Sequence, residues 1–248
     1  MINKNILLII EGEIDEKKYF DRLGELFFDK KAKLVFHSFK SNIYSLYHAI
    51  KDLEYTETLD VIRQISKPED IKHFINLKIA EIYLIFDFDP QEPAYKSDIL
   101  EDMLETFSNE TNYGKLYINY PMFESLKDHN NFNLDDYIHR SISPADCSSR
   151  VYKELVLERG YKKQISSYTQ RHFRKLCKIN LIKGNYMIFN EAVLPDYHNY
   201  QKNMIRNIAT KQMNAVKLKE DIQIINTSVF FLIDYFGERE FVKVSSSK

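Results

Sequence analysis

Only two cysteines, Cys147 and Cys177, occur in the 248 residues. They are too few and too far apart for a disulfide framework or a cysteine-based zinc cluster, so we expect reduced thiols in the core. Long hydrophobic runs are also missing. The apolar stretch at 6–10 ends at Glu11, and polar residues interrupt the stretch at 222–236. Because a membrane span needs about 20 apolar residues and a signal peptide needs a longer apolar core, these absences predict a soluble, cytoplasmic protein with no membrane partner.

The sequence contains no internal repeat, no low-complexity tract and no Gly-x-x-x-x-Gly-Lys-Ser/Thr loop. Without that loop we do not expect the chain to hydrolyse ATP through a P-loop. The composition, 44% hydrophobic and 29% charged, supplies enough apolar residues for a folded core.

The formal net charge of −1 conceals an uneven distribution. Residues 1–140 carry 17 Lys and Arg against 26 Asp and Glu, whereas residues 141–248 carry 18 against 10. An acidic half beside a basic half suits a carboxylate metal site next to a surface that binds a polyanion. The alternative is that the two halves only expose helical surfaces that are solvated differently, which would give the same charge balance in each half.

The first 140 residues alternate between buried-strand and helix patterns. Continuous apolar runs predict strands at 5–10, 33–39, 81–86 and 115–119. Helical spacing lies between them, at 14–28, 42–76 and 98–107, with a fresh helix start at Pro68. This alternation predicts an α/β fold with a parallel sheet of about four strands and flanking helices.

From residue 142 onward the pattern is helical. We expect helices at 149–158, 166–177, 200–216 and 227–236, with Gly184 and Pro195 as breaks between helices. The predicted organisation is therefore a catalytic domain at 1–140, with a helical insertion at about 42–78, and a basic, mainly helical region at 141–248.

Four carboxylates follow predicted strands. Glu11 follows the first, Asp87 and Asp89 follow the third, and Glu124 lies just beyond the fourth. Carboxyl ends of parallel strands share one sheet edge, and clustered carboxylates suit Mg²⁺ or Mn²⁺. Each residue can instead cap the following helix, as Asp89 before Pro90 can. The histidines lack metal-binding spacing, so we expect ordinary core or surface positions for His37, His129, His139 and His172.

The runs LLIIEGEIDEKKYF, YLIFDFD and NYPMFES carry a family resemblance. Glu11-Gly12-x-x-Asp15 after one strand and Asp87-x-Asp89 after another resemble the Toprim domain of topoisomerases, primases and OLD-family nucleases. The longer runs are similar to RloB-like and abortive-infection Toprim proteins of phage defence, and to the Toprim effector of PARIS-type systems. The resemblance covers residues 5–126.

This resemblance implies that Glu11 is a metal ligand or general acid/base, that Asp87 and Asp89 bind the metal, and that Glu124 is an additional acid. Asp15 and Glu124 can each be a ligand of a second metal or a helix cap. The chain departs from the family in two places. It has Tyr-Pro-Met-Phe-Glu where RloB-like proteins have an Asn-Pro-Cys-Phe-Glu type of motif, and its segment between Phe39 and Glu81 is longer than a minimal Toprim crossover.

The basic half contains a helical stripe of cations. Arg171, Arg174, Lys175 and Lys178 recur at helical spacing, and Lys162 and Lys163 precede them. Such a stripe can neutralise the phosphates of a nucleic acid. Nearby aromatic residues can stack on unpaired bases, namely Tyr161, Tyr168 and Phe173. The alternative is a solvated helix with these aromatic residues in the core.

These observations lead us to expect a metal-dependent nuclease that cleaves DNA or RNA, with transfer RNA among the candidates, as an antiviral effector. The resemblance implies a separate ABC-type or related ATPase that senses infection, and the chain can also act as a homodimer. A first alternative is a catalytically degenerate adaptor that binds nucleic acid or an ATPase. A second is a haloacid-dehalogenase-type phosphatase with Asp87 as nucleophile, but such enzymes need Thr or Val where this chain has Gln91.

Overall fold

The computed structural model describes residues 4–29, 32–52, 57–91 and 95–247. Backbone contacts divide the chain into two units, residues 1–86 with 94–117, and residues 87–93 with 118–248. This division does not coincide with the predicted regions 1–140 and 141–248. The reason is that residues 118–140 pair with the C-terminal half, since Tyr120 forms a β-bridge with Ile225, and Ser141, directly after this stretch, pairs with Gln223.

The first unit is built around a sheet with strand order β2-β1-β3-β5-β4. Strand β1 runs parallel to both β2 and β3, and only the short edge strand β4 is shown antiparallel to its neighbour. The expected α/β fold is therefore confirmed, with a sheet that is mostly parallel and has a fifth, antiparallel strand in addition to the four that were expected. The strands are β1 (Lys4–Ile10), β2 (Ala32–Ser38), β3 (Ile79–Asp87), β4 (Ser108–Asn109) and β5 (Gly114–Asn119).

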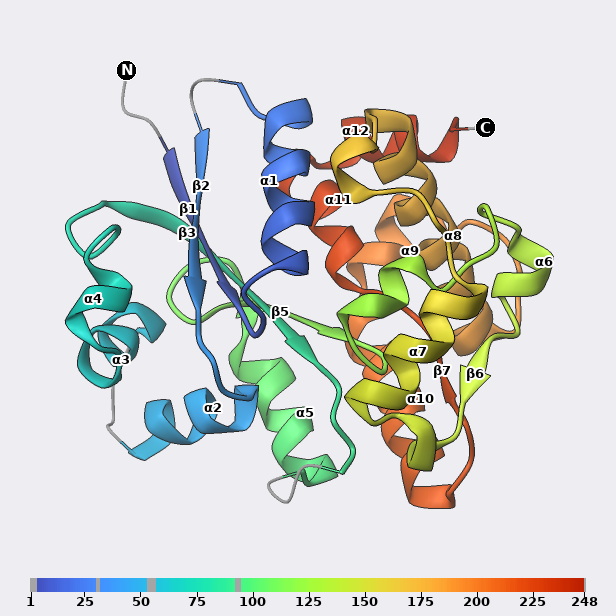
Figure 1. Cartoon of the computed structure of the whole chain (residues 1–248), viewed down its shortest axis with the longest axis horizontal. Coiled ribbons are helices and arrows are strands. Elements are labelled where there is room, and N and C mark those ends of the chain that lie inside the picture. Colours follow the sequence, from blue (N-terminus) through green and yellow to red (C-terminus); the bar gives the residue numbers. More distant parts are fainter. Residues whose placement is uncertain (1–3, 30–31, 53–56, 92–94, 248) are drawn as a thin grey trace. The chain divides into compact units, whose positions relative to one another are not determined.

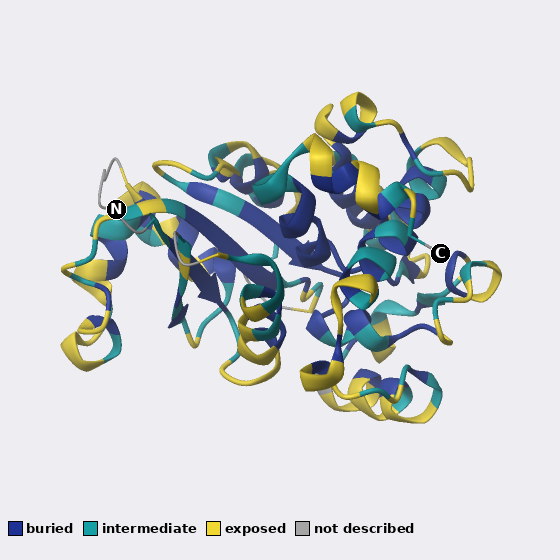
Figure 2. Cartoon of the chain, turned by 90° about the horizontal axis from the view of Figure 1, so that it is seen from above, coloured by how far each residue is buried: buried dark blue, intermediate teal, exposed yellow. Residues whose placement is uncertain are grey.

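Helices cover both faces of this sheet. Helix α1 (Asp15–Phe27) lies on one side of β1, β2 and β3, and α3 (Thr58–Ile65) and α4 (Pro68–Ile71) lie on the other. The inner strands are consequently buried for most of their length, as Figure 2 shows. Residues 6–10 of β1 are at most 1% exposed, which explains their uninterrupted apolar sequence.

The predicted helical insertion at 42–78 consists of three helices in the described residues. Helix α2 (Ile43–Asp52) comes first, followed by α3 and α4 (Figure 1). Pro68 is the first residue of α4, where its missing N–H costs nothing, as the sequence predicted. Residues 53–56 lie outside the described residues. Helix α5 (Ser97–Thr106) matches the helix predicted at 98–107.

The second unit is mainly helical, and it also contains a two-stranded antiparallel sheet, β6 (Ser141–Ile142) with β7 (Ile222–Gln223). The sequence did not predict this sheet, because two-residue strands carry no periodic signal. Its described helices of four or more residues are η1 (Phe123–Lys127, a 3-10 helix), α6 (Leu134–Tyr137), α7 (Ser149–Arg159), α8 (Gln170–Phe189), α9 (Tyr197–Gln201), α10 (Met204–Leu218), α11 (Phe231–Phe236) and α12 (Glu238–Ser245).

The prediction that Gly184 separates two helices is wrong. Gly184 lies inside α8, which is buried there and packs against α10. A Cβ atom on Gly184 would come within 3.0 Å of Ile208 Cδ1, so the glycine allows close approach of the two helices. Pro195, by contrast, lies between α8 and α9, as expected.

Both cysteines are buried and unpaired, which confirms the expectation of reduced core thiols. Burial raises the pKa of the Cys147 thiol to about 12, so this side chain is a neutral thiol at physiological pH. Within the described part of the chain, none of the helices combines the length and apolar character needed to span a bilayer.

Candidate functional site

Glu11 lies in the first unit, directly after β1. Its backbone N–H donates a hydrogen bond to the carbonyl of Ile85 at 3.2 Å, which continues the pairing of β1 with β3. The next residue, Gly12, donates its N–H to the Oε1 atom of the buried Glu16 at 3.1 Å. A Cβ on Gly12 would lie 2.5 Å from Glu16 Oε2, so this turn brings the backbone close to a carboxylate. Asp15 is exposed in the first turn of α1.

Asp87 is the last residue of β3, and it belongs to the second unit. Its Oδ1 atom accepts a hydrogen bond from the backbone N–H of Phe123 at 2.8 Å. The adjacent Phe88 donates its N–H to the carbonyl of Asn119 at 2.9 Å. These two bonds fix the end of β3 against the segment that begins η1, and thereby orient the Asp87 carboxylate.

Asp89 and Glu124 occupy the two segments joined by these bonds. Asp89 Oδ1 accepts a hydrogen bond from the backbone N–H of Gln91 at 3.0 Å, so this residue caps its own turn and not a helix, since the next described helix, α5, begins at Ser97. Glu124 is the second residue of η1, and its Oε1 atom forms an ion pair with Lys153 of α7 at 2.9 Å. Within the second unit, the structure thus brings together the end of β3, with Asp87, and helix η1, with Glu124.

A metal ion at this place would rely on few protein ligands. Among the described residues, no three His, Cys, Asp or Glu side chains gather closely enough to hold an ion. Mg²⁺ in phosphoryl-transfer sites is commonly held by one or two carboxylates together with water and substrate phosphates. Asp87 ends β3 and Asp89 follows two residues later, so this turn is the candidate place for a site of that kind.

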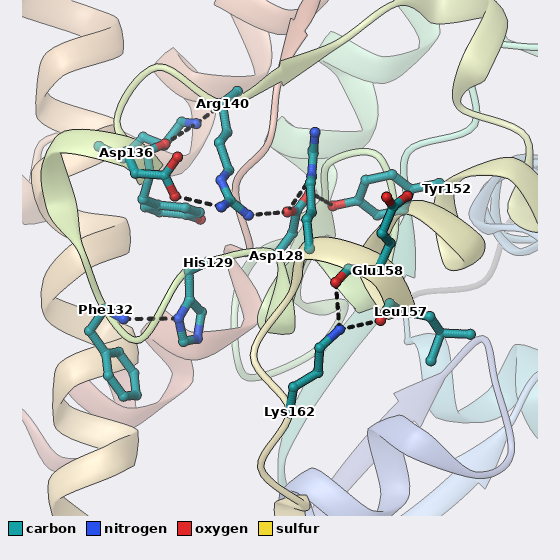
Figure 3. Close-up of polar contacts among 12 residues, drawn as sticks. Asp128, His129, Phe132, Asp136, Arg140, Tyr152, Leu157, Glu158 and Lys162 are labelled. Carbon is teal, nitrogen blue, oxygen red and sulfur yellow. Dashed lines mark hydrogen bonds and ion pairs between the residues drawn. The ribbon is translucent and has the colours of Figure 1, made fainter.

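A buried ionic cluster centred on Asp128 was not predicted from the sequence (Figure 3). The Asp128 side chain is fully buried. Its Oδ1 accepts from Arg140 Nη1 at 2.5 Å and from Arg159 Nε at 2.9 Å. Its Oδ2 accepts from Arg159 Nη2 at 2.7 Å and from the hydroxyl of Tyr152 at 3.0 Å. All four acceptor positions of the carboxylate are therefore used.

This cluster ties three segments of the second unit together. Burial opposes ionisation of Asp128, but the hydrogen bonds and charges of Arg159, with the charge of Arg140, outweigh it and lower its pKa. Nearby, the buried Lys183 of α8 donates to the carbonyls of Tyr137 at 2.9 Å and Arg140 at 2.6 Å. The loop after η1, helix α7 and helix α8 are thus held by charged hydrogen bonds.

Three of the six predicted nucleic-acid-binding cations bind backbone carbonyls or a carboxylate of the second unit. Lys162 donates to the carbonyls of Leu157 and Glu158 at the end of α7 (Figure 3). Arg174 pairs with Glu240 of α12 at 2.6 Å. Lys178 donates to the carbonyls of Ser245 and Ser247, both at 2.8 Å. One side of the predicted stripe therefore holds the C-terminal helix.

The other three cations surround a group of aromatic rings. Lys163 Nζ lies 3.0 Å from His172 Nε2, and Lys175 Nζ lies 5.4 Å from the centre of the Phe132 ring. Arg171 is exposed on the first turn of α8. Burial lowers the pKa of His172, and the positive charges of Lys163, Lys175 and Arg171 lower it further. Lys163, Lys175 and Arg171 therefore all lie close enough to His172 to act electrostatically on its imidazole.

The three aromatic residues that were predicted to stack on bases are not equally exposed. Tyr168 and Phe173 are fully buried, so the core alternative holds for these two. Tyr161 is half-buried at the surface, and so are Phe132 and His172. Phe132 carries no motif or spacing signal, and only its position in the fold places it beside Tyr161.

Comparisons of this chain with protein-family models, with curated proteins and with solved structures find no match.

Proposed function

We propose that this chain is a metal-dependent nuclease of the Toprim type that hydrolyses phosphodiester bonds in DNA or RNA, with transfer RNA as one candidate substrate. The observation that carries the proposal is the sheet order. Strands β1, β3 and β5 are neighbours, and carboxylates follow the end of each: Glu11 after β1, Asp87 and Asp89 at β3, and Glu124 after β5. Open α/β sheets bind ligands at the carboxyl ends of their strands.

In this proposal Asp87 and Asp89 hold Mg²⁺ or Mn²⁺, and the motif resemblance gives Glu11 and Glu124 supporting roles as ligand or general acid/base. A bound divalent ion would polarise the phosphodiester and lower the pKa of a coordinated water. The Phe123 N–H orients Asp87, since it holds one carboxylate oxygen at 2.8 Å. Lys153 holds the Glu124 carboxylate by the ion pair at 2.9 Å.

The proposed role is that of an effector in antiviral defence inside the bacterial cell. Because the sequence has no P-loop, ATP-dependent control would come from a separate ATPase of the ABC type or a related kind. The basic residues of the second unit would supply contacts to phosphates, with Lys163, Arg171 and Lys175 as the candidates on the aromatic side of α8.

The test is cleavage of plasmid DNA and total transfer RNA by the purified chain in Mn²⁺, alone and with its ATPase partner. Asp87→Asn keeps an oxygen that can accept the Phe123 N–H, so it removes charge with little change in fold. We expect Asp87→Asn and Glu11→Gln to lose cleavage by about 100-fold or more, on the order of what loss of a catalytic group costs. The matched controls are the variants Glu13→Gln and Asp98→Asn, which change exposed carboxylates and should cleave normally.

Unchanged cleavage by both Asp87→Asn and Glu11→Gln would show that these carboxylates do not act in the reaction. Binding of nucleic acid without any turnover, even in the presence of the ATPase, would favour the adaptor function instead.

A further inference from the structure

Three aromatic rings meet at the surface of the second unit. They come from the loop before α6 (Phe132), the loop after α7 (Tyr161) and the first turn of α8 (His172), and each is half-buried. The centres of the Phe132 and Tyr161 rings are 5.1 Å apart, and those of Phe132 and His172 are 6.1 Å apart. We refer to Phe132, Tyr161 and His172 as the aromatic surface.

The buried His129 supports this surface from below. Its ring stacks on Phe132 at 4.5 Å and on Tyr161 at 4.9 Å, with interplanar angles of 28° and 30°. His129 Nδ1 accepts the backbone N–H of Phe132 at 3.1 Å (Figure 3). The remaining ring nitrogen, Nε2, is buried and has no hydrogen-bond partner among the described residues.

The backbone presents the Phe132 ring at a conformational cost. Asn131 and Phe132 have φ angles of 47° and 63°, in the left-handed region that a bulky side chain such as Phe rarely adopts. Such strain is retained where the surrounding structure enforces it, and it is concentrated at functional sites. Tyr161 is fixed as well, because its N–H donates to the carbonyl of Lys127 at 2.7 Å. The two rings are therefore held in position before any ligand binds.

The charges beside these rings are positive, and they can therefore bind the phosphates of a nucleotide. Lys163 contacts His172, Lys175 lies over Phe132, and Arg171 is exposed next to His172. Aromatic faces combined with several cations are the features that bind unpaired nucleotides, in which bases stack on rings and phosphates pair with Lys or Arg. Bases inside a duplex are stacked on one another and cannot offer a face to these rings.

We propose that the aromatic surface binds an unpaired nucleotide of the substrate, with the base on Phe132 and Tyr161 and the phosphates at Lys163 and Lys175. This inference rests on the proposed nuclease function and names single-stranded nucleic acid as its substrate class. Loops and ends of folded RNA and single-stranded DNA offer the same chemistry, and the experiment distinguishes them.

The chain contains no tryptophan, so Phe132→Trp introduces a single indole into the aromatic surface, which is excited selectively at wavelengths that the tyrosines do not absorb. The variant is titrated in EDTA with oligo(dT) and oligo(U) of about 12 nucleotides, within the usual site sizes for single strands, and with a blunt duplex of equal length. Phe189→Trp is the matched control, because Phe189 is exposed at the other end of α8.

We expect both single strands, or one of them, to quench the indole fluorescence of the Phe132→Trp variant saturably. The fluorescence of the Phe189→Trp variant should show no saturable change with any of the three ligands. The single strand that quenches Phe132→Trp at the lower concentration identifies the preferred sugar.

Affinity measurements by fluorescence anisotropy provide the second readout. Phe132→Leu and Tyr161→Leu should each weaken single-strand binding about tenfold, within the range for loss of one stacking ring. Tyr161→Phe should bind as the unchanged chain does, because it keeps the ring. Lys175→Gln should weaken binding and reduce its salt dependence by about one ion, whereas Lys217→Gln, exposed on α10, should change neither.

Equal responses of the two tryptophan variants, duplex binding as tight as single-strand binding, or unchanged affinity in Phe132→Leu would each overturn the inference. These measurements use no divalent metal and require no cleavage. They therefore stand or fall separately from the catalytic proposal, which fails if Asp87→Asn cleaves normally.

Discussion

Arg159 holds the Asp128 carboxylate with two nitrogens at once, Nε at 2.9 Å from Oδ1 and Nη2 at 2.7 Å from Oδ2. Arg159 is the last residue of α7, and Asp128 follows η1, so this bidentate pair fixes the two segments that lead to Tyr161 and His129. Such a two-point contact is geometrically demanding and stronger than a single hydrogen bond. The aromatic surface therefore depends on the ionic cluster, whose Asp128 precedes His129 and whose Arg159 lies two residues before Tyr161.

We expect Asp128→Asn to destabilise the protein by about 3–5 kcal/mol, because it leaves the guanidinium groups of Arg140 and Arg159 without their buried counter-charge. Urea unfolding monitored by circular dichroism measures this loss. The matched control is Asp136→Asn, since Asp136 also pairs with Arg140 but is exposed. That variant should lose no more than about 1 kcal/mol. Equal losses in the two variants would contradict the central position of Asp128.

Gly160 is required for the approach of α7 to the loop after η1. A Cβ atom there would lie 2.5 Å from the carbonyl oxygen of Val156 and 2.7 Å from that of Lys127. Because both are backbone atoms, Gly160→Ala should cost about 1–3 kcal/mol in stability and displace Tyr161. Gly24→Ala in α1 meets only the flexible end of Leu34 at 3.3 Å, so it should be neutral or stabilise by up to about 1 kcal/mol. Thermal unfolding of the two variants compares them directly.

The stability of the second unit should fall in mild acid because of His129. Burial lowers the pKa of His129 to about 4, and the charge of Arg140 contributes to this. The unfolded chain, with a histidine pKa near 6.5, then binds more protons than the folded chain between about pH 6.5 and pH 4, so stability decreases as the pH falls through this window. At pH 5 this one group costs about 2 kcal/mol relative to pH 7.

His129→Asn tests this dependence, because it keeps an acceptor for the Phe132 N–H and removes the titration. The difference in unfolding free energy between pH 7 and pH 5 should be smaller than in the unchanged chain by about 2 kcal/mol. His37, whose pKa is also lowered to about 4 by burial, provides an independent contribution in the first unit. An unaltered pH dependence in His129→Asn would show that His129 is not buried as a neutral ring.

The fold of the first unit could be predicted closely because its sequence signals are strong and local. Strand β1 is buried on both faces, and so its apolar run is continuous; Pro68 marks a helix start through its own covalent geometry. Strand β4 could not be predicted, because its two residues, Ser108 and Asn109, are exposed and are placed only by pairing with β5.

The candidate site was predictable in part. The end of a buried strand is visible in the sequence, and it places Asp87 correctly at the end of β3. The Asp128 cluster was not predictable, since its arginines lie 12 and 31 residues away and resemble surface charges in the sequence. Helical spacing correctly put Arg174 and Lys178 on one face of α8, but spacing does not reveal that this face contacts α12 and the residues after it.

The proposal as a whole depends on a divalent ion held by the carboxylates at the end of β3. Isothermal titration of the metal-free chain with Mn²⁺ tests this without substrate or partner. The account predicts binding by the unchanged chain and by Asp98→Asn, and loss of binding in Asp87→Asn and Asp89→Asn. Binding of Mn²⁺ by both of the latter variants with unchanged affinity would contradict it.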